Sequence, residues 1–141
     1  MEYLCGGRLF YHLKLEKKFS EDKVRFYTAQ IVLAIHYLHK KGVIYRDLKP
    51  ENVILDIDGN VKLTDFGIAK RGVKGLKKSY TFCGTSEYIA PEFLEGRGHN
   101  KSVDWWCLGV MLYEMLCGES PFTGIDKKNR SHLFTAIKSV S

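Results

Sequence analysis

Apolar residues recur at helical spacing between positions 19 and 42 of the chain. They fall every three or four positions, and the set is Val24, Tyr27, Ile31, Ala34 and Leu38. This spacing is typical of one buried stripe on an amphipathic helix. Ser20 can cap the helix, acidic residues follow in its first turn, and Gly42 can end it. The pattern therefore predicts a helix with a single core-facing stripe.

A second segment, residues 102–118, is apolar on nearly every side. Its sequence SVDWWCLGVMLYEMLCG predicts a helix buried in the middle of the fold, with Trp105 and Trp106 as core residues rather than a ligand platform. The segment is too short for a membrane span and is interrupted by Glu114. Residues 131–141 are predicted to form one more short helix.

Two short β-rich segments, Val53–Leu55 and Val61–Leu63, flank the sequence Asp58-Gly59-Asn60. Such a turn between two β-rich segments predicts an antiparallel hairpin. Residues 71–79 are glycine-rich and basic without apolar periodicity, which predicts a mobile loop. The expected fold class is therefore mainly α with a small β-hairpin, in one compact domain.

Composition narrows the classes of function without choosing one. With 141 residues and 45% hydrophobic content, the chain can bury one core. Its net charge of +6 permits an acidic partner, but nothing supports nucleic-acid stacking. The four cysteines form no C-x-x-C pair, and the five histidines have no metal-site spacing, so none is assigned chemistry. We expect a cytoplasmic or nuclear protein with no signal peptide and no membrane partner.

The chemistry is concentrated in the polar loop, residues 45–52, with the sequence YRDLKPEN. The predicted hairpin would bring this loop beside residues 65–67, which read DFG. Asn52 and Asp65 then suit a magnesium ion shared with a nucleotide, because Mg²⁺ prefers oxygen ligands and phosphate. Asp47 would be free to accept a proton, and Lys49 could neutralise charge on a phosphoryl group. Taken singly, such carboxylates more often cap turns in loops.

The motifs YRDLKPEN, DFG and APE, in this order and spacing, resemble those of eukaryotic protein kinases. Tyr45, TFCGT and VDWWCLG resemble the AGC group, and MEYLCGG, GHNKSVDWW and PFTG are most similar to ribosomal-protein S-six kinases. The resemblance implies a protein-kinase-like fold, with residues 1–141 forming part of the catalytic domain, its C-terminal lobe. It also implies transfer of the γ-phosphoryl group of Mg-ATP to protein serine or threonine.

The resemblance also implies roles for single residues. Asp47 would be the catalytic base and Lys49 would contact the γ-phosphate, while Lys49 and Thr85 indicate a serine/threonine rather than a tyrosine kinase. Asn52 and Asp65 would bind magnesium. The positions implied to contact or pack near the nucleotide are Glu2, Leu4, Leu9, Glu51, Asn52, Ile54 and Asp65. Asp104 would accept backbone N–H groups of the polar loop and so fix it.

A regulatory site is implied at Thr81 within SYTFCGT, phosphorylated by an upstream kinase. Arg46 and Lys70 match the basic residues that receive the phosphate through charge-assisted hydrogen bonds. Between Asp65 and Glu87 the chain has five basic residues and no acidic one, so the unphosphorylated segment is expected to be loose.

The sequence also departs from the family. The glycine-rich loop and the ATP-binding lysine of the N-terminal lobe do not occur, nor do the last helices, whose arginine would pair with Glu92. Arg8 stands where the group has an acidic residue, so the preference for basic substrates should be weaker. We therefore expect no phosphoryl transfer by the isolated chain. The alternatives are an inactive interaction module, a piece of a longer active kinase, and, least favoured, a small-molecule phosphotransferase.

Overall fold

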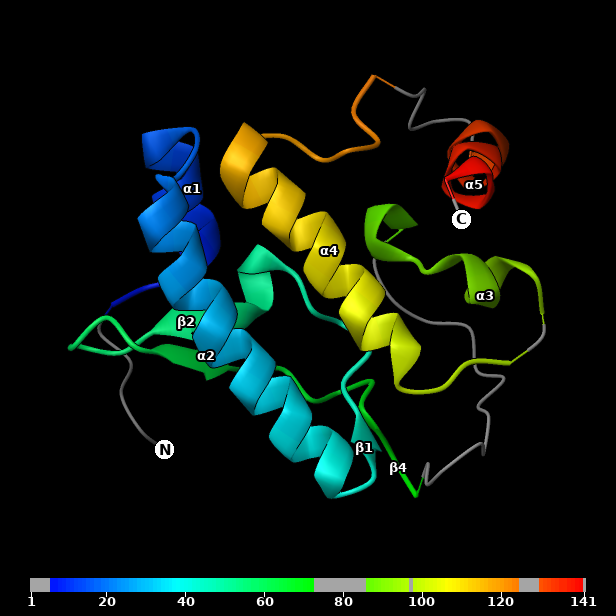
Figure 1. Cartoon of the computed structure of the whole chain (residues 1–141), viewed down its shortest axis with the longest axis horizontal. Coiled ribbons are helices and arrows are strands. Elements are labelled where there is room, and N and C mark those ends of the chain that lie inside the picture. Colours follow the sequence, from blue (N-terminus) through cyan, green and yellow to red (C-terminus); the bar gives the residue numbers. More distant parts are fainter. Residues whose placement is uncertain (1–5, 73–85, 97, 125–129, 141) are drawn as a thin grey trace.

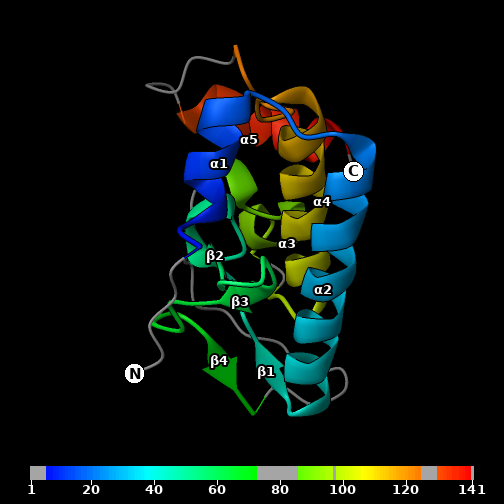
Figure 2. The ribbon, with the colours of Figure 1, turned by 90° about the vertical axis from the view of Figure 1, so that its left-hand side faces the viewer.

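A computed structural model describes residues 6–72, 86–96, 98–124 and 130–140. Helices dominate these residues: α1 (Leu9–Glu16), α2 (Glu21–Lys40), α3 (Pro91–Leu94), α4 (Ser102–Cys117) and α5 (Arg130–Ser139), with short 3₁₀ turns at Pro50–Asn52 and Ser86–Tyr88. The strands are β1 (Val43–Ile44), β2 (Val53–Leu55), β3 (Val61–Leu63) and β4 (Lys70–Arg71). In Figure 1, α2 and α4 lie side by side across the molecule. Figure 2 shows the strands on one side of this helix pair.

Helix α2 begins and ends close to the predicted residues. The Ser20 hydroxyl accepts a hydrogen bond from the Lys23 N–H at 3.4 Å, and Gly42 follows the helix with φ of 70°. Its buried residues are Val24, Tyr27, Ile31, Ile35 and His39. The predicted stripe is therefore right in the first half of the helix and wrong in the second, where Ala34 and Leu38 are only half-buried. Beyond Ile31 the buried residues follow at intervals of four, Ile35 and then His39, and His39 contacts Asp104 of α4.

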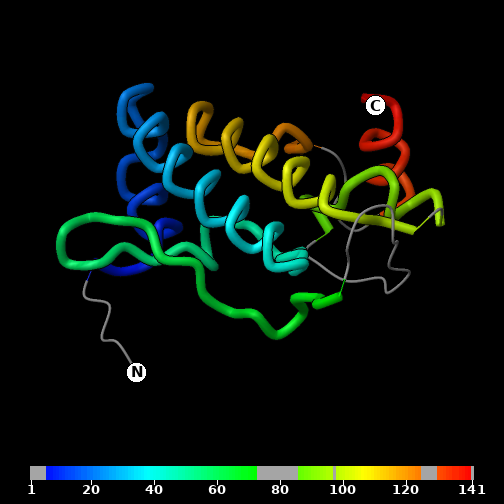
Figure 3. Tube along the Cα trace, turned by 60° about the horizontal axis from the view of Figure 1, so that its bottom comes forward, coloured from blue at the N-terminus to red at the C-terminus, as the bar shows by residue number. Residues whose placement is uncertain are grey.

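The predicted hairpin is present. Strands β2 and β3 pair antiparallel with Val53 opposite Leu63 and Leu55 opposite Val61, and Figure 3 shows their connecting turn at one end of the molecule. A second small sheet was not predicted: β1 pairs antiparallel with β4, placing Val43 opposite Arg71. Arg71 therefore lies in a strand rather than in the predicted loop, whose residues 73–79 lie outside the described ranges. Two-residue strands are too short to give a sequence signal.

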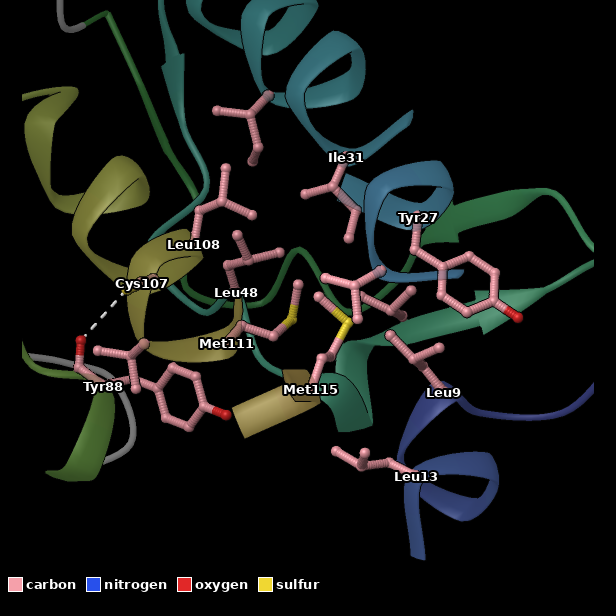
Figure 4. Packing of buried hydrophobic residues seen from close by; sticks show 14 of the residues in the cluster. Leu9, Leu13, Tyr27, Ile31, Leu48, Tyr88, Cys107, Leu108, Met111 and Met115 are labelled. Atoms are coloured by element: carbon pink, nitrogen blue, oxygen red, sulfur yellow. Dashed lines mark hydrogen bonds between the residues drawn. The ribbon is translucent and has the colours of Figure 1, made fainter. Parts of the chain in front are cut away.

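The core forms where α4 meets α1, α2 and the polar loop. Met111 and Met115 are fully buried, and Figure 4 shows them among labelled residues from α1, α2 and the polar loop, including Leu9, Ile31 and Leu48. The expectation that α4 is buried on nearly every side was wrong for one face. Trp105 is 39% exposed and contacts the edge of the core through the His39 ring, whereas Trp106 is half-buried and packs against the core.

The fold class is therefore mostly helical with small antiparallel sheets. Among the described residues, no helix is both long enough and apolar enough to cross a membrane.

Candidate active site

The polar loop is anchored to the core through one buried carboxylate, that of Asp104 on α4. This side chain is fully buried. One of its oxygens accepts the backbone N–H of Arg46 at 2.7 Å, and the other accepts the backbone N–H of Tyr45 at 3.0 Å and lies 2.7 Å from His39 Nε2. Arg46 has φ of 69°, a left-handed conformation that non-glycine residues rarely adopt. The Asp104 hydrogen bonds hold the loop in that conformation.

Within the loop, the side chains of Lys49 and Asn52 both contact the Asp47 carboxylate. Lys49 Nζ lies 3.0 Å from one carboxylate oxygen of Asp47. The Asn52 amide nitrogen donates to the other carboxylate oxygen at 2.7 Å and to the Asp47 carbonyl at 2.9 Å. Asn52 is 5% exposed and ends the 3₁₀ turn that begins at Pro50. The structure therefore brings Asp47, Lys49 and Asn52 together in a fixed geometry.

The DFG segment joins this cluster through Thr64. Both the backbone N–H and the hydroxyl of Thr64 donate to the Asn52 carbonyl, at 2.9 Å and 3.1 Å. Asp65 follows with φ of 55°, and its exposed carboxylate accepts the Gly67 N–H at 3.2 Å. Asp65 therefore directly follows a residue, Thr64, that is hydrogen-bonded to Asn52.

Tyr45 also contacts the segment that carries Asp65. Its hydroxyl donates to the Thr64 carbonyl, and its ring contacts the Phe66 ring edge-on at 5.2 Å between centroids. Burial raises the pKa of Tyr45, and the negative charges of Asp47 and Asp65 raise it further. The hydroxyl therefore stays protonated and remains a donor.

The donor set suits a magnesium ion. The Asn52 nitrogen is committed to Asp47, which leaves its amide oxygen as the group able to bind a cation. Together with the Asp65 carboxylate this gives two oxygen donors from protein, the pattern found where phosphate oxygens complete the shell of Mg²⁺.

The expected nucleotide positions are only partly described. Leu9 is fully buried and Ile54 is half-buried. The segment before α1 lies along β2, with the Gly6 N–H donating to the Leu55 carbonyl at 3.0 Å and Arg8 bridging to Ile54. Glu2 and Leu4 lie outside the described residues.

The two basic residues expected to receive the phosphate differ in burial. Arg46 is buried, and its Nε and Nη2 donate to the Ile68 carbonyl. Lys70 is exposed on β4. Thr81 and Thr85 lie outside the described residues. Glu92 is half-buried and accepts a hydrogen bond from the Ser102 hydroxyl at 2.5 Å.

Sequence reasoning missed an acidic hollow of about 520 Å³ beside the polar loop. Its lining includes three carboxylates, those of Glu51, Glu87 and Glu114. The Tyr88 hydroxyl donates to Glu114, and burial followed by the Glu114 charge raises the pKa of Tyr88. The available signal was Glu114, a carboxylate that interrupts an otherwise apolar stretch of α4.

Comparison with known proteins identifies the family. The model of the protein kinase domain matches residues 1–140. The chain belongs to the protein kinase family. This kinase is 52% identical over 128 residues to ribosomal protein S6 kinase beta of Caenorhabditis elegans, and 56% identical over 127 residues to a RAC family serine/threonine-protein kinase homolog of Dictyostelium discoideum. It is 55% identical over 126 residues to RAC-beta serine/threonine-protein kinase B of Xenopus laevis.

These alignments cover 89–91% of the kinase chain but only 23–29% of the relatives. The chain thus spans about a quarter of the length of the curated relatives it matches. The predicted membership in the AGC group of serine/threonine kinases is confirmed.

Proposed function

We propose that the chain forms the C-terminal-lobe part of a kinase catalytic domain that transfers the γ-phosphoryl group of Mg-ATP to protein serine or threonine. The observation that carries this proposal is the hydrogen-bonded cluster of Asp47, Lys49 and Asn52, joined to Asp65 through Thr64. Such a cluster provides what phosphoryl transfer needs, which is positioning and charge stabilisation rather than covalent chemistry.

Each residue of the cluster has a separate role in the proposed reaction. Asp47 accepts the proton of the substrate hydroxyl, since one oxygen of its carboxylate is oriented by Asn52 and the other by Lys49. Lys49 stabilises negative charge on the phosphoryl group. Asn52 and Asp65 hold the magnesium ion, which when bound neutralises the phosphate charge.

The substrate side of the proposal rests on the acidic hollow. Glu51, Glu87 and Glu114 line it, so it favours substrates with a basic side chain near the acceptor. Arg130 also lines the hollow, and the exposed Arg8 stands two residues before Phe10, another residue of the lining. The preference for basic substrates is therefore weaker than the carboxylates alone would give.

Regulation by phosphorylation of Thr81 is also part of the proposal. Arg46 is the principal receptor, because its backbone N–H donates to the Asp104 carboxylate and so holds the residue in place. Lys70 supplies a second positive charge from the exposed face of β4. An upstream kinase would add the phosphate.

Magnesium-dependent nucleotide binding tests the proposed site. The full chain, labelled with ¹⁵N, is titrated with a non-hydrolysable ATP analogue with and without Mg²⁺. We expect magnesium-dependent shifts at the Asn52 side-chain amide and the Gly67 N–H, and their loss in Asp65→Asn. The exposed turn residue offers a matched control, Asp58→Asn, which should bind as the native chain does. Shifts that do not depend on magnesium, or that survive in Asp65→Asn, would contradict the assignment.

Phosphoryl transfer is measured separately with a basic peptide and Mg-ATP. We expect no turnover by the isolated chain. Turnover that disappears in Asp47→Asn would overturn that expectation while supporting the role of Asp47.

A further inference from the structure

Two hollows of the surface adjoin at Phe10 and Glu114. One is the acidic hollow beside the polar loop, and the other, of about 710 Å³, lies between the end of α1 and the end of α4. Phe10 and Glu114 line both of them, so the two hollows form one groove that begins beside the polar loop. We call the second part the lysine hollow, because its lining includes Lys14, Lys17 and Lys18.

The three lysines of this hollow can each meet an anionic ligand. They are exposed, and none of them forms an ion pair with a residue that the structure describes. Lys14 Nζ lies 5.2 Å from the centroid of the Phe10 ring, which places this ammonium group near the junction of the two hollows. A lysine over an aromatic ring keeps its charge and can still pair with a carboxylate.

Three carboxylates in the same lining offset these charges only in part. Glu16 pairs with Lys23 at 2.5 Å, and Glu114 accepts a hydrogen bond from the Tyr88 hydroxyl and belongs to the acidic hollow as well. Glu119 is exposed and forms no ion pair within the described part of the chain. The lysine hollow therefore has an excess of positive charge, whereas the acidic hollow has an excess of negative charge.

The backbone fixes the lysines against the end of α4. Lys17 has φ of 65°, and its carbonyl oxygen comes so close to Gly118 that a Cβ there would lie 2.4 Å away. The Phe19 N–H donates to the Met115 carbonyl at 2.9 Å. The link between α1 and α2 is thus held on the end of α4 (Figure 1), and its lysines keep their place along the groove.

We propose that this groove selects a peptide of mixed charge, with basic side chains in the acidic hollow and acidic side chains in the lysine hollow. The inference rests on the proposed function and deepens it, because it names the class of protein substrate. Between Phe10 and Lys17 the helix rises about 10 Å, which an extended peptide spans in about three residues. The acidic residues of the substrate therefore lie about that far beyond the basic ones, on the side away from the acceptor.

Peptide binding to the full chain tests this selection without nucleotide, so its outcome is separate from that of the magnesium titration. The probe has alanine at the acceptor position, arginines beside it and glutamates about three residues further on, and it is made in both chain directions. A matched peptide has glutamine in place of each glutamate. In fluorescence anisotropy at low salt, we expect the better direction to bind at least about fivefold tighter than its glutamine form. This preference should disappear at about 0.5 M salt, because exposed charges are then screened.

Variants of the lining locate the preference. Lys14→Gln, Lys17→Gln and Lys18→Gln together should remove it and leave binding of the glutamine peptide unchanged. Glu119→Gln should increase it, because a competing negative charge is lost. The exposed Lys40, at the opposite end of α2 from the link, provides the matched control, and Lys40→Gln should keep the native preference. Lysines that only stabilise the end of α4 would lower the free energy of unfolding when replaced without changing the peptide preference.

Two results would overturn the inference. One is equal affinity of the native chain for the mixed-charge peptide and its glutamine form in both chain directions, a measurement that needs no variant. The other is a folded triple lysine variant that keeps the native preference. Selective peptide binding by a chain that shows no magnesium-dependent nucleotide binding would support the groove and contradict the proposed catalysis instead.

Discussion

Replacing Asp104 with asparagine tests whether one carboxylate holds the polar loop in place. In the native chain the two oxygens of Asp104 face three donors, the backbone N–H groups of Tyr45 and Arg46 and the His39 ring nitrogen. An amide has the same shape but one acceptor oxygen. Whichever way it turns, its NH₂ group faces at least one backbone N–H, and that donor is left buried without a partner.

The expected loss of stability follows from these hydrogen bonds. A hydrogen bond to a charged group contributes about 1.5–3 kcal/mol, and a buried donor left unsatisfied adds to the loss. At least one such bond disappears in Asp104→Asn, so the free energy of unfolding should fall by about 2–4 kcal/mol. That is a large fraction of the roughly 5–15 kcal/mol typical of a domain.

Urea unfolding followed by circular dichroism measures the loss, with amide hydrogen exchange at Tyr45 and Arg46 as a local readout. Both amides should exchange much faster in Asp104→Asn. The control is Asp22→Asn, because the Asp22 side chain is 93% exposed and its pair with Arg25 contributes about 0.5 kcal/mol or less. A loss below about 1 kcal/mol, with exchange at both amides unchanged, would refute the anchoring argument.

Three further predictions concern the core, a turn and pH. Met111→Ala should reduce the free energy of unfolding by about 2–5 kcal/mol because Met111 is fully buried, against about 0.5 kcal/mol for Leu33→Ala at an exposed site; urea unfolding measures both. Gly118→Ala should reduce the free energy of unfolding by about 2–4 kcal/mol, and Gly59→Ala should reduce it by about 1 kcal/mol. Both glycines have positive φ, but a Cβ at position 118 would overlap a backbone carbonyl oxygen. Equal losses of stability in the two variants would contradict this. His99 binds a proton more weakly in the folded chain, so below its ordinary pKa of 6.5 the unfolded chain gains the proton first, and stability should fall by about 3 kcal/mol between pH 6.5 and pH 4. His99→Phe should remove this part of the pH dependence of thermal unfolding.

Local signals predicted those parts of the fold that local interactions determine. The turn at Gly59 and the cap at Ser20 act within a few residues, and the β2–β3 hairpin and the start of α2 are where the sequence placed them. The β1–β4 pairing joins residues 26 and 28 positions apart through strands of two residues each, and no local pattern encodes it. The exposed face of Trp105 was mispredicted because hydrophobicity alone does not tell which elements pack against a helix.

The candidate site was predicted from motif spacing, and Asp104 was expected to accept backbone N–H groups of the polar loop, as it does. The supporting contacts of His39 and Thr64 came only from the structure. His39 has no metal-site spacing and was assigned no chemistry, yet it contacts Asp104 at 2.7 Å. Histidines that act through a single buried neighbour leave no periodic signal, because the neighbour is distant in sequence: 65 residues separate His39 from Asp104.

Asn52 explains why so many polar groups can lie beside a core. Its side chain binds Asp47, while its own carbonyl accepts both hydrogen bonds from Thr64. One residue therefore connects the proposed catalytic base to the segment that carries Asp65, and both connections are short. Because Asn52 is 5% exposed, water competes weakly for these bonds, so the two halves of the proposed site keep a fixed spacing. The side chains of Asp47, Lys49 and Asn52 bond to one another, and Asp104 accepts the Tyr45 and Arg46 N–H groups, which lets this part of the loop pack on an apolar core.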